Sequence, residues 1–457
     1  MRRKDIIHIG VRTDGVSTDT GRSSDGLPWY LSISETARRE VQLPYHRKLR
    51  VRMSPTSDPI ILPVEPHWRA RFSTRDVLVP VRVNKNKHGI VLGPIVGILT
   101  VKRPGQASGF RGNKANFRDI VLAGKRLGVT VFVFTPDGLI SDNRVKGYVL
   151  SGRTGSSGKR IWRRVVLPLP SVVYNRVPDR EAEQTAAVRR AKKWLEERGI
   201  VLFNNGFFNK REVHEWLLGS EATARHLPHT EELRDERQIG RLLRRYPLLY
   251  VKPVDGKAGE GIIQIRHEGR GYRVVYQSGG KRTAMRYGSR KEAAQAAYRK
   301  AAGRSYLLQQ GIFLANHDGR LFDLRVLLQK NRYGEWRVTG LGARIADRDG
   351  ITTHVPNGGR IEKAYIALQG AFGQAKGRSV ELRAREAALQ MARRIEEEAK
   401  REGGEIGEMS MDIGVAADGE LWFFEANAKP MKFDEPLIRK KSLLRLVQYC
   451  DYLARVK

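Results

Sequence analysis

The chain has 457 residues, of which 40% are hydrophobic and 29% are charged, so its composition is that of a folded protein with about three domains. Lys and Arg number 84 against 49 Asp and Glu, a net charge of +35 that favours anionic partners without identifying one. Cys450 is the only cysteine, the N-terminus has no apolar leader, and no apolar run reaches the length of a membrane span. We therefore expect a protein that remains in the reducing cytoplasm.

The first 90 residues are expected to form a small β-rich N-terminal unit. Short β-prone segments such as WYLSI, LRVRM and DVLVPVRV alternate with prolines over residues 27–90. No run with the helical period interrupts them.

Residues 91–199 have the pattern of an α/β domain. A strand in GPIVGILTV is followed by a helix over 113–127 and a second strand in VTVFVF. A strand–helix–strand unit predicts a parallel layer, which PSVVYNRV and a helix over 180–198 extend. The intervening SGRTGSSGKR is expected to be a basic loop, and its glycine spacing does not match a phosphate-binding P-loop.

Residues 200–457 are expected to form a second, larger layered domain. IVLFN reads as a strand, NKREVHEWLLG as a helix, LPHT as a turn and LLYVKPV as a strand after a helix that ends near Tyr246. Further strands are expected in YLLQQGI, FDLRVLLQK, EWRVTGLGARIA and over 412–427. Long charged helices are expected over 379–402 and after Pro436.

The segment SMDIGVAADGELWFFEANAKP predicts a β-hairpin that pairs two carboxylates. The Asp-Gly dipeptide at 418–419 favours a two-residue turn. Counting outward from this turn places Gly414 opposite Phe423 and Asp412 opposite Glu425. Like charges directly opposite each other destabilise a sheet, so the pair needs a cation.

Asn427 adds a third oxygen ligand on the same face of the hairpin. A few side-chain oxygens are what Mg²⁺ uses when it keeps waters and binds nucleotide phosphates. We therefore predict a magnesium site at Asp412, Glu425 and Asn427. The alternative is a solvated hairpin whose acids pair with Lys429 or Lys432.

The segment LLYVKPVDGKAGEGIIQI predicts a phosphate-binding element. Its loop contains Gly256, Gly259 and Gly261, which allow backbone N–H groups to approach phosphate oxygens. Lys252 lies inside an apolar strand, where a lysine needs an anionic partner. The alternative is an ordinary glycine-rich hairpin whose lysine reaches solvent.

Five further residues are candidates for the same site. Lys210, early in its helix, can reach a phosphate, while Arg325 and Arg344 lie on predicted strands and can bind a phosphate or a carboxylate in bidentate fashion. Gln310 and Gly311 end a strand where backbone groups can face an adenine. A surface lysine and a structural Asp323–Arg325 pair are the competing interpretations.

Taken in order, NKREVHEWL, LPHT, LLYVKPVDGKAGEGI, LLQQGI, FDLRVLLQK, RIA and MDIGVAADGELWFFEANAKP resemble the ATP-grasp superfamily. GPIVGILT, LPLPSVVYNRVPDREAE, LFNNGFFNK and ITTHVPNGG resemble, more closely, the YheC/YheD family of endospore coat-associated proteins. The resemblance begins near Gly93 and continues to the C-terminus. It implies a pre-ATP-grasp α/β domain at 91–199 and an ATP-grasp domain at 200–457.

The resemblance also implies a function and its residues. Lys210, Lys252 and the loop over 256–261 would bind ATP, and the three predicted oxygen ligands would bind Mg²⁺. The implied reaction is ATP-dependent joining of a carboxylate to an amine through an acyl phosphate, with Arg325 and Arg344 as catalytic residues. The implied setting is a sporulating cell, with association to an anionic coat or cell-wall component. Asn209-Lys210 departs from the usual Asp-Lys of the helix motif, and Lys257 and Glu260 replace small residues.

Two other classes of function compete with a ligase. One is a non-catalytic ATP-binding protein of the spore coat that keeps the cleft. The other is a polyanion-binding protein that depends on the +35 charge. The sequence has no zinc-finger spacing, RNP-like string or basic-zipper pattern, so specific nucleic-acid binding is not expected.

Overall fold

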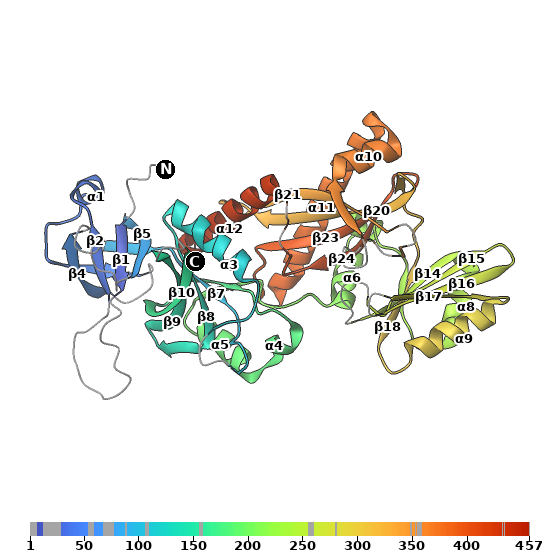
Figure 1. Ribbon diagram of the computed structural model, residues 1–457, viewed down its shortest axis with the longest axis horizontal. Helices are drawn as coiled ribbons and strands as arrows, with labels where there is room; N and C mark the ends of the chain where they lie inside the picture. The colour runs from blue at the N-terminus through green and yellow to red at the C-terminus, as the bar shows by residue number, and fades with distance from the viewer. Residues whose placement is uncertain are drawn as a thin grey trace.

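The computed structural model describes residues 7–11, 29–53, 59–66, 77–86, 89–105, 109–154, 159–254, 260–278, 281–347, 350–351, 353, 359–431, 433 and 435–456. These residues form an elongated molecule with a β-barrel at one end and an open sheet flanked by two helices at the other (Figure 1). Two further sheets lie between them. None of the helices in these ranges is long and apolar enough to cross a bilayer.

The N-terminal strands close into a six-stranded barrel in the order β1-β2-β4-β3-β6-β5. The strands are β1 (Ile7–Val11), β2 (Trp29–Ile33), β3 (Lys48–Arg52), β4 (Ile60–Pro66), β5 (Val77–Asn86) and β6 (Gly89–Gly93). Ile9, Leu31 and Val81 are among the side chains buried in its core. The predicted β-rich character is confirmed, but a short helix α1 (Glu35–Glu40) was not predicted; Ser34 caps its first turn.

The second sheet has the order β10-β9-β8-β7-β11-β12. Its strands are β7 (Ile95–Leu99), β8 (Thr130–Ser141), β9 (Arg144–Thr154), β10 (Lys159–Pro168), β11 (Val172–Asn175) and β12 (Val201–Phe203). The strands β8, β7 and β11 are parallel, as predicted, and β12 joins them in the same direction. Because β12 pairs with β11, this sheet continues past residue 199, where the sequence pattern places a domain boundary.

Helices α3 (Lys114–Leu127), α4 (Arg180–Gln184) and α5 (Ala186–Glu196) accompany this sheet. Asn113 caps α3 as an acceptor for the Asn116 N–H, and Gly128 ends the helix in the left-handed conformation, so the predicted helix is confirmed. The prediction of a loop for SGRTGSSGKR is wrong at both ends. Antiparallel β9 and β10 extend into it, with Arg153 opposite Arg160, and residues 155–158 lie outside the described ranges.

The third sheet, which we call the lid sheet, has the order β13-β18-β14-β15-β16-β17. It consists of β13 (Thr230–Glu232), β14 (Leu248–Pro253), β15 (Ile263–Glu268), β16 (Gly271–Ser278), β17 (Lys281–Tyr287) and β18 (Tyr306–Gln310). Helices α8 (Glu236–Arg245) and α9 (Arg290–Ala301) cover one face. Leu249, Val251, Ile263 and Ile265 point to that covered face and form its core with the helices.

The fourth sheet, which we call the central sheet, has the order β22-β21-β20-β23-β24. Its strands are β20 (Arg320–Lys330), β21 (Trp336–Ile345), β22 (Arg360–Lys363), β23 (Glu408–Val415) and β24 (Leu421–Asn427), with the short β19 (Asn316–His317) beside β20. Helices α6 (Lys210–Leu218), α7 (Glu221–Ala224), α10 (Ala364–Phe372) and α11 (Gln374–Arg401) pack near it.

The C-terminal helix α12 (Pro436–Val456) joins the central sheet to the second sheet. It contacts β20 and β21 as well as α3. Leu446, Val447 and Cys450 are buried in one cluster with Ile120 of α3, so this helix fixes how the two sheets lie.

Candidate active site

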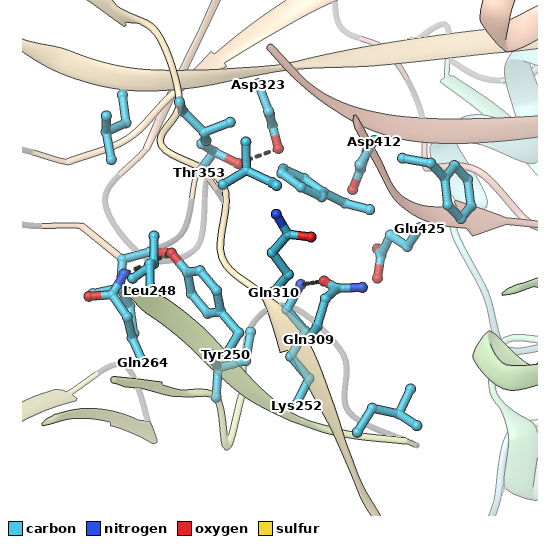
Figure 2. Close-up of a pocket in the computed structure, with 18 of the residues that line it drawn as sticks. Leu248, Tyr250, Lys252, Gln264, Gln309, Gln310, Asp323, Thr353, Asp412 and Glu425 are labelled. Atoms are coloured by element: carbon cyan, nitrogen blue, oxygen red, sulfur yellow. Dashed lines mark hydrogen bonds between the residues drawn. The ribbon is translucent and has the colours of Figure 1, made fainter. Parts of the chain in front are cut away.

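A cavity of about 280 Å³ lies between the lid sheet and the central sheet. Six of the residues predicted from the sequence line it: Lys210, Lys252, Gln310, Arg344, Asp412 and Glu425. Strands from both sheets direct side chains toward this space (Figure 2). The structure therefore brings together residues that are separated by up to 215 positions in the chain.

The lid sheet provides one wall through strand β14. Leu248, Tyr250 and Lys252 alternate toward the cavity, while the residues between them face the helices. The Lys252 ammonium donates a hydrogen bond to Gln309 Oε1 and lies 5.2 Å from the Tyr250 ring centre. Burial lowers the pKa of Lys252 to about 8, with a further contribution from nearby Lys210. An anion would relieve this cost.

The central sheet provides the opposite wall, and the predicted carboxylate pair is confirmed: Asp412 on β23 faces Glu425 on β24. The predicted register nearer the turn is wrong, because Gly414 pairs with Trp422 and not with Phe423. The turn contains one residue more than a two-residue hairpin, and a bulge in β24 restores the register before Asp412.

Asp412 is a buried carboxylate whose charge is not satisfied by hydrogen bonds. Its side chain is 2% exposed, and within the described part of the chain neither oxygen accepts a hydrogen bond. The guanidinium groups of Arg344 and Arg325 approach to 2.9 and 3.6 Å. Burial raises the pKa of Asp412 to about 6, although both arginines oppose this effect and Glu425 adds to it.

Arg344 is fixed mainly by another acid. Its Nε and Nη2 both donate to Asp323, at 2.9 and 2.5 Å, and Thr353 Oγ1 donates to the same carboxylate at 2.6 Å. Burial lowers the pKa of Arg344, but the charges of Asp323 and Asp412 outweigh burial and raise it overall. The Arg344 guanidinium thus stays charged at the cavity wall.

Arg325 does not form the Asp323 pair that competes with its functional interpretation. Arg325 is on β20, directly opposite Asp412 of β23, and it donates a hydrogen bond to Ser410 Oγ at 3.3 Å. It is absent from the cavity lining, so it contacts the site through Asp412.

Glu425 connects the cavity to the remaining predicted ligands. Lys210 Nζ lies 3.7 Å from Glu425 Oε2, and Asn427 Nδ2 donates to Glu425 Oε1 at 3.1 Å. Asn427 itself does not line the cavity. The alternative partner Lys429 is engaged elsewhere, because its ammonium pairs with Glu183; Lys432 lies outside the described ranges.

The backbone N–H groups of Gln310 and Gly311, predicted to face an adenine, donate hydrogen bonds within the protein. The Gln310 N–H donates to the His229 carbonyl, and the Gly311 N–H donates to the Leu248 carbonyl. A Cβ on Gly311 would lie 2.1 Å from Leu248 Cγ, so glycine is needed here for close packing. Only the Gln310 side chain lines the cavity.

The glycine loop is only partly described. Gly256 and Gly259 lie outside the described ranges. Gly261 has φ +75°, which suits glycine, but its N–H donates to the Gln277 carbonyl and it does not line the cavity. The Gly261 N–H is therefore engaged within the protein, and its contact with phosphate stays a prediction.

Several residues that line the cavity were not predicted from the sequence. Tyr250 precedes Lys252 by two positions, so strand alternation could have found it. Gln309, which accepts the hydrogen bond from Lys252, could be paired with it only once the strand order was known. Thr353 comes from a loop whose position no local pattern predicts.

Two facing sheets, with a buried lysine on one wall and paired carboxylates on the other, have the architecture of an ATP-grasp protein. The family model described as YheC/D like ATP-grasp matches residues 199–453. The chain belongs to this YheC/YheD family. Over 396 residues it is 31% identical to the endospore coat-associated protein YheD of Bacillus subtilis, covering 84% of this chain and 82% of that protein. With YheC of the same organism it shares 22% identity over 322 residues, 70% and 83% of the two chains.

Solved structures with a similar fold include D-alanyl-alanine synthetase A from Vibrio cholerae, with a TM-score of 0.44 and 12% identity over 79% of this chain and 98% of that one. VanG D-Ala:D-Ser ligase from Enterococcus faecalis has a TM-score of 0.44 and 13% identity over the same shares.

Proposed function

We propose that this protein binds Mg-ATP in the cavity between the lid and central sheets and phosphorylates a carboxylate so that an amine can attack it, with release of ADP. The observation that carries the proposal is the pairing of buried Asp412 with Glu425 at the wall facing Lys252. A buried acid without hydrogen bonds is costly, so a bound cation explains why it is kept.

The donor set fits Mg²⁺. The described residues contain no group of three His, Cys, Asp or Glu that could hold a metal alone. Two carboxylates and the Asn427 amide oxygen are nevertheless sufficient for an ion that keeps waters and takes phosphate oxygens. Asp412, Glu425 and Asn427 would hold the ion, which would supply neutralisation of charge on the phosphoryl oxygens.

The basic side chains have separate roles in this proposal. Lys252 and Lys210 hold the nucleotide phosphates, and the lowered pKa of Lys252 rises again once an anion is beside it. Arg344, oriented by Asp323, faces the phosphoryl group as its charge develops. Arg325, which lies outside the cavity lining, positions the Asp412 carboxylate and would act on the acyl phosphate through it.

A location at the endospore coat is also part of the proposal, because the curated relatives are named endospore coat-associated proteins. A coat protein that binds ATP without turnover would keep the same cavity. Product analysis separates the two possibilities.

The experiment is to incubate the protein with Mg-ATP, hydroxylamine and candidate amino acids, peptides or cell-wall precursors. An activated acyl group should give a hydroxamate together with ADP and phosphate. Arg325→Ala should reduce trapping at least tenfold while ATP affinity changes little, and Arg337→Ala, an exposed change on β21, is the control. AMP and pyrophosphate, or ATP binding without any hydroxamate, would overturn the ligase proposal.

A further inference from the structure

Three arginines lie side by side across the lid sheet. Arg266 on β15 is directly opposite Arg273 on β16, and Arg273 is directly opposite Arg286 on β17. Residues paired in this way share one face of a sheet, and neighbouring strands are about 4.8 Å apart. The arginine row, defined as these three residues, therefore spans about 10 Å.

The arginine row lies on the cavity face of the lid sheet. Arg266 pairs with Leu248, and both residues line the cavity. The alternate residues Ile265 and Val274 are buried against the face that α8 and α9 cover. The row thus begins at the cavity and ends at β17, the last strand of the sheet.

The arginine row destabilises the ligand-free protein. Like charges directly opposite one another destabilise a sheet. Glu268 is the acid near the row, 3.9 Å from both Arg266 and Arg286, whose side chains are 51% and 85% exposed. The described residues include no ion-pair partner for Arg273. Residues 263–287 carry six Lys or Arg and one Glu, so little local charge compensates the row.

The side chains beside the arginine row indicate which class of anion it binds. Guanidinium groups match carboxylates in bidentate geometry. Single-stranded nucleic acid uses aromatic platforms as well, yet Val275 and Ala284 are the residues beside the row on β16 and β17. Among the described residues, the ring that contacts an arginine of the row is Phe313, which lies 5.8 Å from the Arg266 guanidinium at the cavity itself.

We infer that the arginine row binds an acidic peptide and guides its carboxylate into the cavity. This inference rests on the proposed function and deepens it, because it names a polycarboxylate as the substrate class. The extra carboxylates of the peptide neutralise the row while one carboxylate enters the cavity for activation.

The test uses fluorescein-labelled poly-L-glutamate of about 20 residues and fluorescence anisotropy on the full chain. Arg273→Gln/Arg286→Gln should weaken binding at least tenfold and lower the salt dependence of the affinity. The matched control is Arg378→Gln/Arg393→Gln, which removes the same charge from exposed positions on α11. It should leave binding within about twofold.

Thermal unfolding provides a second measurement. Removing two of three facing charges should raise the melting temperature of the free protein by about 1–2 °C, whereas the control pair should not. Equal weakening by both pairs would show non-specific charge attraction and overturn the inference. Tighter, row-dependent binding of oligo-dT would overturn the peptide class. Mg-ATP calorimetry is read separately: its failure would remove the proposed function, whereas loss of row-dependent polyglutamate binding would remove this inference alone.

Discussion

The two ends of strand β20 show two different uses of buried charge. At one end, Lys330 is 4% exposed and its ammonium lies 2.6 Å from Glu396 and 2.7 Å from Glu405. At the other end, Asp323 of β20 and Asp412 of the adjacent strand β23 line the cavity. In the first cluster, which we call the closed end, the charged groups pair with one another. In the second, which we call the open end, the Asp412 carboxylate accepts no hydrogen bond from the described residues.

This difference separates a structural cluster from a binding site. Lys330 joins the central sheet to α11 and to the segment before β23, and Tyr449 of α12 also bonds it at 3.1 Å. The charged groups of this cluster pair with one another, so the cluster needs no ligand. Asp412 has two arginines nearby, but its oxygens accept no hydrogen bond from the described residues, and a bound cation or an added proton would reduce the cost of burying it.

The largest effect is expected at the closed end. Lys330→Met should destabilise the protein by about 3–5 kcal/mol, because two carboxylates that are each only 13% exposed lose their shared buried cation. Chemical denaturation would measure the loss. Lys400→Met is the control: this lysine also contacts Glu396 but is 54% exposed, so its removal should cost less than about 1 kcal/mol. Equal losses would show that the cluster does not depend on burial.

At the open end, Glu425→Gln should change binding and not folding. The substitution keeps the shape of the side chain and removes half of the facing charge pair, so stability should change by less than about 1 kcal/mol. Magnesium-dependent ATP affinity should fall at least tenfold. A magnesium titration identical to wild type would remove Glu425 from the site.

A smaller effect is expected from the pH dependence of Lys252. Its pKa is about 8 in the folded protein, below its unfolded value near 10.5, so the unfolded state binds more protons between these values. The charged lysine therefore lowers the free energy of unfolding fully below pH 8, and this destabilisation disappears as pH rises toward 10.5. Relative to Lys252→Met, the free energy of unfolding of the ligand-free protein should rise by about 2–3 kcal/mol across this range, at about 1.4 kcal/mol per pKa unit. A constant difference between the two proteins would contradict the shifted pKa.

Much of the fold follows from local patterns. The helix over 113–127 and the strands β14, β18, β20, β21, β23 and β24 that form the cavity walls were predicted, because apolar periodicity and capping residues act locally. The strands β16, β17 and β22, at or beside the edges of the two sheets, were not predicted. The β9–β10 pairing was missed because a Gly/Ser-rich basic segment has no strand pattern of its own. Strand partnership decides its structure.

The candidate site, too, was predicted only where its residues lie close together in the sequence. Asp412 and Glu425 were paired by counting along one hairpin, and even an error in the turn was cancelled by a bulge. The bond of Gln309 to Lys252 depends on the order of strands in the lid sheet. The arginine row depends on register across three strands, which the sequence of each strand does not specify alone.

Calorimetric titration with Mg-ATP, compared between the wild type and Lys252→Ala, tests most directly whether this cavity binds the nucleotide. We expect binding that requires magnesium in the wild type, and affinity at least tenfold lower in the variant because the phosphates lose a buried cation. Equal ATP affinity in the two proteins, or no binding to either, would contradict the assignment of this cavity to the nucleotide.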